Sequence, residues 1–549
     1  VQAVRGQLSR AEALQAAGSY DDGLTAARVA LTAAESLGWP PLVVAARLRV
    51  GHLLGLSGKI AEADATLEDA YFQASEIGAL EVAATASTLL VYMVGYKESR
   101  HAEGKRWWRQ AEVLSKQIGA GEGDPLPVLA LSNLALVYDS MGAYEDALAL
   151  HERALASRER ALGPDHPTVA DSLHNLGTVL DRMGRYEEAL RYHERALAIR
   201  ERAYGPLHPE VASSLNNLGA VQFSLGAYAQ AKALFERALE IAARSLGPDH
   251  PTVADYTTNV ANAEYMMGAL AAAKPRYERS LAILEKLHGP EHPSLGDPLN
   301  NYANLLDMTG ERAAARAMYL RALAIRERAF GPDHPVVADS LSSLAGGDTA
   351  AGEYAEARAL NERALAIRER ALGPEHPAVA ESLHNLANVE LLTGETAKAR
   401  ALYERALAIH ERAGGPEHPD VAYHLTALAE VALAERRPAD AIPLAERAIR
   451  IRSRGEVPGG LLAQSKFRLA LALWAAPTDR GGDPGRALAL ARECREALRE
   501  ATDEALRAEV EAFLALHAGG GQASAPGAGS TSRGRPSGPH RAARSRSPD

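Results

Sequence analysis

A pentapeptide recurs along this chain at a fixed interval of 42 residues. It reads Gly-Pro-(Asp/Glu/Leu)-His-Pro, and its copies begin at Gly163, Gly205, Gly247, Gly289, Gly331, Gly373 and Gly415. A degraded copy lies one period earlier, at residues 121–125. A fixed period of this length is the signature of a repeat array, in which each unit packs only against its neighbours. The 549 residues are also far more than one core usually serves.

Each period contains two amphipathic helices. In one copy, Pro167 opens the first helix, because a helix start does not need the missing N–H, and Gly184 ends it. Residues 186–203 form the second helix, which stops at Gly205. Glycines equivalent to Gly184 recur at Gly142, Gly226, Gly268, Gly310, Gly352 and Gly394, with looser counterparts at Gly18, Gly58, Ser99, Arg436 and Gly482. The pattern predicts an all-α fold of about twelve helical hairpins.

The regularity of the repeat changes along the chain and suggests four segments. Residues 1–120 contain divergent hairpins, and residues 121–455 form the regular array. Residues 456–517 hold a degenerate last hairpin and an amphipathic capping helix, which a solenoid needs at its open apolar end. Residues 518–549 are rich in Gly, Ser, Pro and Arg, so they cannot bury a core, and we expect them to be disordered.

Several strings resemble the tetratricopeptide repeat. Leu131-x2-Leu134-Ala135-x2-Tyr138 fits its first helix, and Ala231-x3-Phe235-x2-Ala238 fits its second. The 42-residue unit "HPxVAxxLxNL…GxYxxAxxxxERALAI" resembles the kinesin-light-chain type of this repeat. The resemblance implies a right-handed superhelical solenoid that binds proteins. The N-terminal third, with "GSYDDGLTAARVAL" and "AEGKRWWRQAEVL", is similar to the helical arrays that follow bacterial Ser/Thr kinase domains.

Three positions on the first helix of each repeat are polar without a packing reason. The first row comprises Asn133, Asn175, Asn217, Asn259, Asn301 and Asn385, with Ser343 and Ala427 in the remaining copies; the second comprises His174, Asn216, Thr258, Asn300 and His384; the third comprises Thr178, Asn262, Asn304 and Asn388. Asparagine is a middling helix former, so its repetition has a cost. One interpretation is a peptide groove, since an amide can both donate to and accept from a peptide backbone. The alternative is that these amides bond the neighbouring hairpin.

The family resemblance supports the groove interpretation for part of the first row. In the family, asparagines at this position hold the ligand backbone, which implies that role for Asn175, Asn217, Asn259, Asn301 and Asn385. A row of acids lies near the start of the same helices, at Asp171, Asp255, Asp297, Asp339 and Glu381. These acids suit the helix dipole, but they also bias a groove toward basic or neutral peptides. Some family members clamp a ligand carboxylate with Lys, and that position lacks Lys here.

The sequence offers no catalytic or cofactor site. The single cysteine, Cys494, allows no disulfide and no cysteine-rich metal site. The seven His-Pro histidines lie one hairpin apart, too far to share a metal ion, and no hydrolase, kinase or nucleotide-binding motif occurs. The net charge of −10 argues against nucleic acid. No apolar run approaches the ~20 residues that span a membrane, and residues 1–10 lack a signal segment, so we expect a cytoplasmic protein that is not an enzyme.

The leading hypothesis is a scaffold that binds an extended peptide or a partner protein. The alternative is a regulatory arm of a bacterial signalling enzyme, a Ser/Thr kinase, whose catalytic domain lies upstream of Val1. One repeat departs from the pattern, because Gly346 and Gly347 stand in the middle of its first helix and Gly347 replaces a Val or Leu of other copies. Mid-helix glycines cost about 1 kcal/mol each, so we expect a soft joint there.

Overall fold

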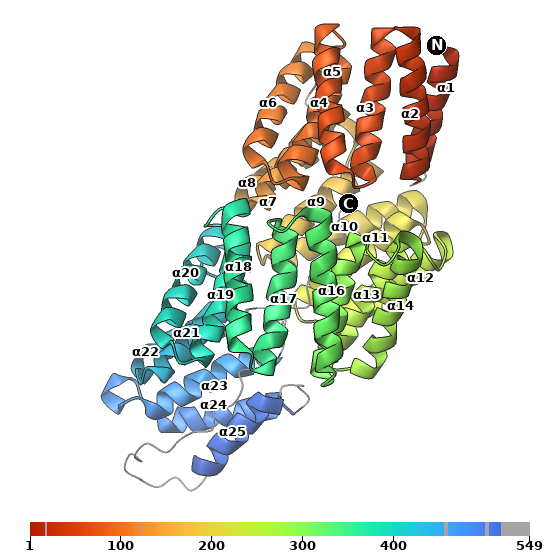
Figure 1. Cartoon of the computed structure of the whole chain (residues 1–549). Coiled ribbons are helices and arrows are strands. Elements are labelled where there is room, and N and C mark those ends of the chain that lie inside the picture. The colour runs from red at the N-terminus through yellow and green to blue at the C-terminus, as the bar shows by residue number, and fades with distance from the viewer. Residues whose placement is uncertain (17–18, 122, 455–458, 500–503, 518–549) are drawn as a thin grey trace. The chain divides into compact units, whose positions relative to one another are not determined.

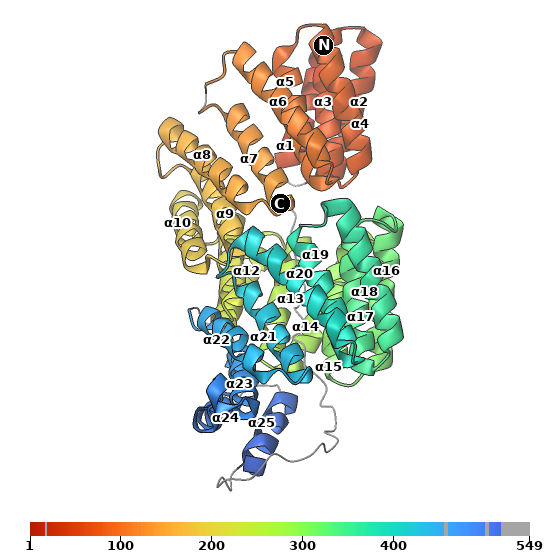
Figure 2. The same ribbon diagram turned by 90° about the vertical axis from the view of Figure 1, so that its left-hand side faces the viewer.

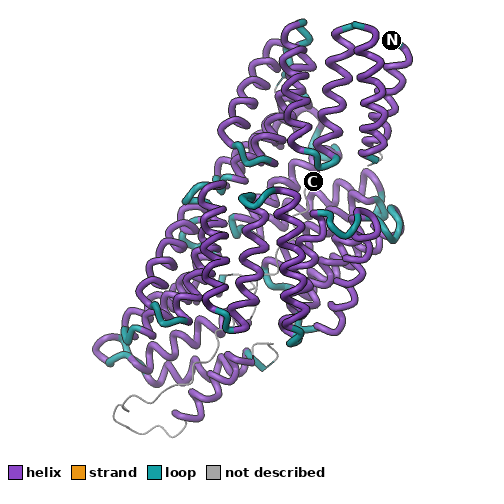
Figure 3. Tube along the Cα trace, viewed as in Figure 1, coloured by secondary structure: helices purple, strands orange, loops and turns teal. Residues whose placement is uncertain are grey.

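Short turns divide the chain into helices that pair in sequence order. The computed structural model describes residues 1–16, 19–121, 123–454, 459–499 and 504–517. These residues form 25 α-helices and three short helical segments, and no strand occurs among them (Figures 1 and 3). The prediction of an all-α stack of hairpins is confirmed. The Arg-rich segment 518–549 lies outside the described residues. No helix in the described ranges is long and apolar enough to cross a membrane.

The chain divides into two compact units, of which the first comprises residues 1–180 and 191–203. Its elements, including most of α9 and α10, are α1 (Gln2–Ala16), α2 (Tyr20–Leu37), α3 (Pro40–Leu56), α4 (Ile60–Glu76), α5 (Leu80–Leu90), the π-helical η1 (Val91–Lys97), α6 (His101–Gln117), α7 (Pro125–Ser140), α8 (Tyr144–Leu162), α9 (Pro167–Arg182) and α10 (Tyr186–Tyr204).

The second unit comprises residues 181–190 and 204–549. Its helices are α11 (Pro209–Ser224), α12 (Tyr228–Ser245), α13 (Pro251–Met266), α14 (Leu270–His288), η2 (Pro293–Leu295), α15 (Gly296–Met308), α16 (Arg312–Phe330), α17 (Pro335–Ala351), α18 (Tyr354–Leu372), α19 (Pro377–Leu392), α20 (Thr396–Gly414), α21 (Pro419–Ala434), α22 (Pro438–Arg452), α23 (Gly459–Ala475), η3 (Thr478–Arg480), α24 (Pro484–Ala497) and α25 (Glu504–His517). Consecutive helices of this unit pack side by side, as α16, α17 and α18 do in Figure 2.

Two left-handed residues per repeat set the turns. The glycines that end the first helices, from Gly142 to Gly394, have φ between 71° and 89°, and the pentapeptide glycines have φ between 84° and 95°. Glycine adopts this conformation without the steric cost that a Cβ brings. Of the looser counterparts, Ser99 and Arg436 are also left-handed, with φ of 57° and 59°. Near the last hairpin, the left-handed residue is Gly481 rather than Gly482.

The histidine of the pentapeptide caps the following helix. In all seven copies, Nδ1 of the histidine accepts a hydrogen bond from the backbone N–H two residues on, at 3.1–3.3 Å. A helix start leaves four N–H groups without partners in the helix, and the imidazole satisfies one of them. The proline that follows has no N–H to satisfy. The His-Pro pair is therefore a helix-start signal.

The apolar core is a series of small clusters shared between neighbouring hairpins. In one cluster, Leu306 and Tyr319 of the α15–α16 hairpin pack with Val337 and Leu341 of α17 and with Ile367 of α18. Alanines of these clusters, such as Ala364, are fully buried. Helix α17 runs through both of its central glycines without a break. Each hairpin thus depends on its neighbours for burial, as expected of a repeat array.

The histidine cap predicts a local dependence on pH. Burial lowers the pKa of His334 in the folded chain. As pH falls below about 6.5, the imidazole is therefore protonated more readily in the unfolded chain than in the folded chain. The stability that the cap contributes is complete above that pH and is lost as pH falls toward the lowered pKa. Replacing His334 by Asn, which caps helices without titrating, keeps the cap at pH 5, whereas His334→Ala costs about 1 kcal/mol at neutral pH.

Hydrogen exchange of the first turn of α17 measures this effect. In the wild-type chain, we expect the exchange rate, corrected for its intrinsic dependence on pH, to rise as pH is lowered from 7.5 to 5. In His334→Asn, we expect the corrected rate to stay constant. Equal acceleration in both chains would contradict the role of the imidazole. The first turn of α19, capped by His376, serves as the internal reference in every variant.

Candidate peptide-binding face

The third polar row is explained by packing within each hairpin. The hydroxyl of Tyr277 on α14 donates a hydrogen bond to Oδ1 of Asn262 on α13, at 2.6 Å. Tyr319 and Asn304 form the same bond one repeat on, and Tyr403 and Asn388 form it in α20 and α19. Burial raises the pKa of Tyr277 well above its ordinary value, so the hydroxyl stays a donor.

Repeats without this tyrosine also lack the asparagine. Ala220 is followed by Phe235 at the same 15-residue spacing, and Gly346 is followed by Asn361. Thr178 of α9 donates instead to the backbone oxygen of His174 in its own helix, at 3.1 Å. The asparagine and tyrosine therefore act as a pair that joins the two helices of a hairpin.

The first polar row is partly used between hairpins and partly open. In the first unit, Asn133 donates to the backbone oxygen of Thr88 on α5, at 2.9 Å. In the second unit, Nδ2 of Asn259 donates to Oδ1 of Asn216, at 2.8 Å. Asn301 is 1% exposed, and neither its Nδ2 nor its Oδ1 has a hydrogen-bond partner among the described residues.

The other first-row asparagines lie nearer the surface. Asn175 in the first unit and Asn217 and Asn385 in the second are half-buried. The side chains of Asn175 and Asn385 make no hydrogen bond to any described residue. An amide in this position retains its full capacity to donate and accept.

The second row makes contacts between repeats. Nδ2 of Asn300 on α15 donates to Oγ of Ser340 on α17, at 3.3 Å, and its Oδ1 has no partner among the described residues. The ring of His384 lies with its Nδ1 3.1 Å from Nδ1 of His424, across the α19–α21 contact. In the first unit, His174 packs against the ring of His193.

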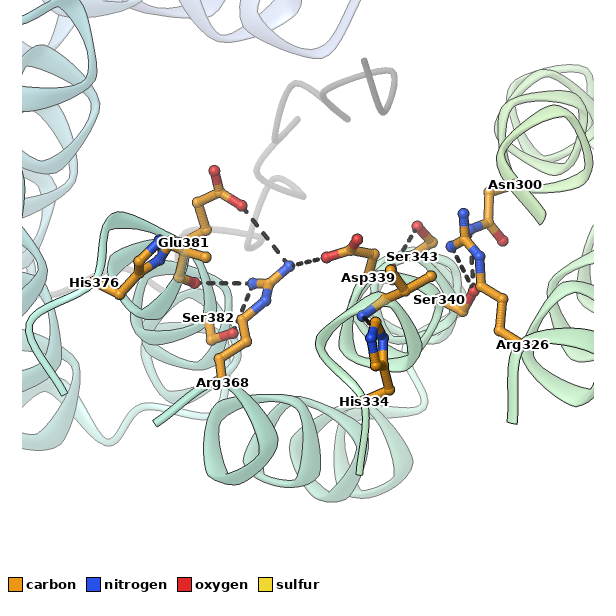
Figure 4. A network of polar contacts seen from close by, with 12 residues as sticks. Asn300, Arg326, His334, Asp339, Ser340, Ser343, Arg368, His376, Glu381 and Ser382 are labelled. Carbon is orange, nitrogen blue, oxygen red and sulfur yellow. Dashed lines mark hydrogen bonds and ion pairs between the residues drawn. The ribbon is translucent and has the colours of Figure 1, made fainter. Parts of the chain in front are cut away.

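Buried arginines join neighbouring hairpins next to these rows, an arrangement we call the arginine bridges. Arg368 of α18 is 4% exposed and donates to Oδ1 of Asp339 on α17, at 2.7 Å, and to Oγ of Ser382 on α19, at 2.8 Å. It also donates to the backbone oxygen of Ala378 and lies 3.8 Å from Glu381. Figure 4 shows the guanidinium between these helices. One side chain thus ties its own hairpin to the next.

The same bridge recurs elsewhere in the array. Arg326 of α16 joins Asp297, at 2.6 Å, to Ser340, at 2.9 Å. In the first unit, Arg200 of α10 pairs with Asp171 of α9, at 2.8 Å. In α22, Arg452 donates to Ser465, at 2.6 Å, and the ring of Tyr423 stands in for the acid, 4.9 Å from the guanidinium carbon.

Where the arginine is missing, its serine is missing too. The arginine and serine positions, 14 residues apart, hold Ala242 with Tyr256, and one repeat later Leu284 with Pro298. In a third repeat they hold His410 and His424, whose Nδ1 and Nε2 atoms lie 2.8 Å apart. The pair is exchanged as a unit, because a buried serine or guanidinium left alone would lose its hydrogen bonds.

The acid row is therefore mostly neutralised, with one exception. Asp171, Asp297 and Asp339 pair with bridge arginines. Asp255 faces a repeat whose arginine position is Leu284, and it has no ion-pair partner among the described residues. Burial raises the pKa of Asp255 to about 6, and the charge of Asp297 adds to the rise. Among the described residues of the acid row, Asp255 is thus the one without a cation of its own.

A separate row of arginines ties the second helices to the preceding turn. Arg363 donates to the backbone oxygen of Pro332, at 3.2 Å, and to Glu327 of the previous second helix, at 2.6 Å. Equivalent bonds run from Arg195, Arg321, Arg405 and Arg447 to the carbonyls of Pro164, Pro290, Pro374 and Pro416. These exposed pairs contribute little stability each.

A stack of two-helix hairpins that recur with a period of 42 residues defines a helical-repeat protein. The chain belongs to the tetratricopeptide repeat family. The family model matches residues 127–202, 180–244, 210–286, 253–328, 299–369, 336–410 and 379–454, which together cover more than half of the chain. A comparison with curated proteins finds no match.

Solved structures of similar proteins include kinesin-light-chain-like repeats. TPR-like repeats of this type from Podosopora anserina are 26% identical, with a TM-score of 0.32, and cover 37% of this chain and 97% of that one. BtubC (BKLC) from P. vanneervenii is 19% identical, with a TM-score of 0.33, and covers 42% and 91%. A Rap protein complexed with competence and sporulation factor is 15% identical, with a TM-score of 0.45, and covers 67% and 98%.

The exchange of the arginine bridge as a unit predicts coupling between its two positions. We expect Arg368→His alone to destabilise α19 by about 2 kcal/mol, because it removes the bonds to Asp339 and Ser382. Adding Ser382→His recreates the pairing of His410 with His424 and recovers about 1 kcal/mol at pH 8. Native-state hydrogen exchange of α19 in the four chains of the double-mutant cycle measures the coupling. Strictly additive effects would refute it.

Proposed function

We propose that this chain is a protein-binding scaffold and that the first helices of its second unit bind an extended peptide segment of a partner. Tetratricopeptide repeats form scaffolds for protein–protein interaction, and the family is established by the match over residues 127–454. The proposed contacts come from the first polar row, at Asn217, Asn301 and Asn385. The third row serves the hairpins and lies outside the proposed site.

One observation carries the proposal: the first row keeps amide groups that the fold does not use. The half-buried Asn385 makes no side-chain hydrogen bond to a described residue, and the buried Asn301 has two unpartnered polar atoms. An unsatisfied buried polar group costs about 1–3 kcal/mol, whereas the asparagines of the third row pair with tyrosines within their hairpins. A peptide backbone offers the donor and acceptor that the amide of Asn385 lacks.

The charge beside this row favours a basic segment. Asp255 lies one helical turn before Asn259 on α13, and no bridge arginine stands at the position of Leu284. A Lys or Arg side chain of the ligand would supply the missing cation there. Because its neighbour Asp297 is paired with Arg326, the proposed ligand needs only one basic residue at this point.

Selection from a displayed random-peptide library with the full chain as bait tests the proposal. Fluorescence anisotropy then measures the affinity of a selected peptide for the wild-type chain and for the triple variant Asn217→Ala, Asn301→Ala, Asn385→Ala. Loss of three amides should weaken binding by about 10- to 2000-fold, since each net hydrogen bond contributes about 0.5–1.5 kcal/mol.

Ser343→Ala is the matched control, since it stands at the same repeat position but removes no amide. Its affinity should equal that of the wild-type chain. If the triple variant keeps its helical circular-dichroism spectrum and binds the peptide as tightly as the wild-type chain, the row is not the binding site.

Binding of a basic peptide should depend on pH through Asp255. Its carboxyl, with a pKa of about 6, is charged at pH 7.5 and largely protonated at pH 5. The affinity of an arginine-containing peptide should therefore fall as pH falls through 6. Asp255→Asn should bind weakly at both pH values. Asp333→Asn, which removes an exposed carboxylate paired with Arg370, should keep the wild-type pH profile. If Asp255→Asn also keeps the wild-type pH profile, the carboxyl of Asp255 does not cause the pH dependence of binding.

A further inference from the structure

Three imidazoles meet where α19, α20 and α21 pack together. Nδ1 of His384 on α19 lies 3.1 Å from Nδ1 of His424 on α21. The other ring nitrogen of His424, Nε2, lies 2.8 Å from Nδ1 of His410 on α20. His410 and His424 are buried, whereas His384 is half-buried, so the His384 end lies nearest the solvent. The three side chains form a chain of hydrogen bonds that we call the histidine bridge.

The histidine bridge stands where the preceding junction has an arginine bridge. His410 and His424 occupy the positions that Arg368 and Ser382 hold one repeat earlier. A guanidinium keeps its charge at every pH that a folded protein meets, whereas an imidazole ordinarily titrates near pH 6.5. The two kinds of bridge therefore occupy equivalent places in the array but differ in their response to protons.

One carboxylate stands at the acid position of the histidine bridge. Glu381 of α19 precedes His410 by 29 residues, which is the spacing that separates Asp339 from Arg368. Its carboxylate lies 3.8 Å from the guanidinium of Arg368, so it already has a cationic neighbour. Glu381 can therefore balance a positive charge on the bridge only in part.

The other titratable and charged groups around the bridge come from α20, α21 and α22. They are Tyr403, whose ring centroid lies 5.2 Å from that of His384; His418, 6.0 Å from the ring of His410 and 4.0 Å from the carboxylate of Asp420; and Tyr423, which has Arg452 4.9 Å from its ring. Among these groups and Glu381, the two carboxylates both have partners. The surroundings of the bridge thus offer little compensation for a second positive charge.

The two contacts limit the number of protons that the bridge holds. They involve four ring nitrogens, and each contact holds one proton between its two nitrogens. Three neutral imidazoles carry three protons, so the third proton lies on an outer nitrogen, Nε2 of His384 or Nε2 of His410. A fourth proton occupies the other outer nitrogen and leaves both contacts intact. A fifth proton must enter a contact, where two N–H groups then face each other and the hydrogen bond is lost.

We propose that the histidine bridge is a pH-sensitive contact of the array: α19 and α21 stay joined while the bridge carries at most one positive charge, and they separate when a second imidazole is protonated. The closed junction holds at most four ring protons, whereas three imidazolium groups in the open junction hold six. Because the open junction binds two more protons, lower pH shifts the equilibrium toward it. The proposal does not depend on peptide binding by the asparagine row.

Native-state hydrogen exchange of the full chain between pH 7.5 and pH 5 tests the proposal. With rates corrected for their intrinsic dependence on pH, the opening constant of the middle of α21 should rise below pH 6 with a slope that approaches about hundredfold per pH unit, because two protons are taken up. The middle of α17, which the bridges of Arg326 and Arg368 contact, is the internal reference and should show a much smaller rise.

Two variants change the proton count by different amounts. His384→Asn introduces the residue that Asn216 and Asn300 supply at the same repeat position. It leaves one contact between imidazoles, so the open junction binds one more proton than the closed junction, and the slope should fall to about tenfold per pH unit.

The double variant His410→Arg, His424→Ser restores the residues of an arginine bridge, and its slope in α21 should fall to that of α17. Both variants keep the capping histidines His376 and His418, so the contribution of the caps is common to all three chains. Circular dichroism at pH 7.5 confirms that each variant is folded.

The proposal is overturned if exchange in α21 has the same pH dependence in the wild-type chain and in the double variant. An equal rise in α21 and α17 of the wild-type chain would also overturn it. If the double variant does not fold, His384→Asn still decides, because a slope equal to that of the wild-type chain contradicts the proton count.

Discussion

Within each unit, the described hairpins bury apolar side chains against the hairpins before and after them, so the offset between neighbours decides whether the stack holds. The arginine bridges fix that offset. Arg368 contacts an acid in its own hairpin and a serine and a carbonyl in the next. Burying a guanidinium is costly unless all its donors are satisfied, and a shifted hairpin would leave them unsatisfied. A shift of one hairpin relative to the next therefore costs free energy through the bridge. Apolar contacts between alanines and leucines depend less on the exact position of the hairpins.

Physical grounds place the candidate functional positions where the chain departs from the repeat. A regular repeat satisfies its third-row asparagine internally, as the pairing of Asn304 with Tyr319 illustrates. The repeat of Leu284 and Pro298 abandons the bridge and leaves Asp255 without its cation, and the repeat of Gly347 leaves a cavity beside Asp348. Natural chains break a local rule at functional sites and compensate elsewhere. For the repeat of Gly347, the bridges of Arg326 and Arg368 on its two sides supply that compensation.

The hairpins could be predicted from the sequence because their signals are local. The left-handed turns fall at the recurring glycines and even at Ser99 and Arg436, where only the period pointed to them. The bridges escaped prediction because Arg326 and Ser340 belong to different repeats, and each residue alone suits a solvated helix. Their joint replacement by His410 and His424 was the available signal. The kinase-linked alternative rests on strings in the N-terminal third and stays a prediction.

An asparagine of the first polar row can bond the neighbouring hairpin or bind a ligand, but it cannot do both with its full hydrogen-bonding capacity. An amide that bonds its neighbour, as Asn259 bonds Asn216, stiffens the stack but has less capacity left for a ligand. An amide without a partner, such as that of Asn385, weakens the stack slightly and keeps its donor and acceptor available. Because the arginine bridges already set the offset, the row does not have to supply it. The arginine bridges align the hairpins, and the asparagines are left to bind a ligand. The face can therefore carry unpaired amides without loss of order in the array, and unpaired amides are what hydrogen bonding to a peptide backbone requires.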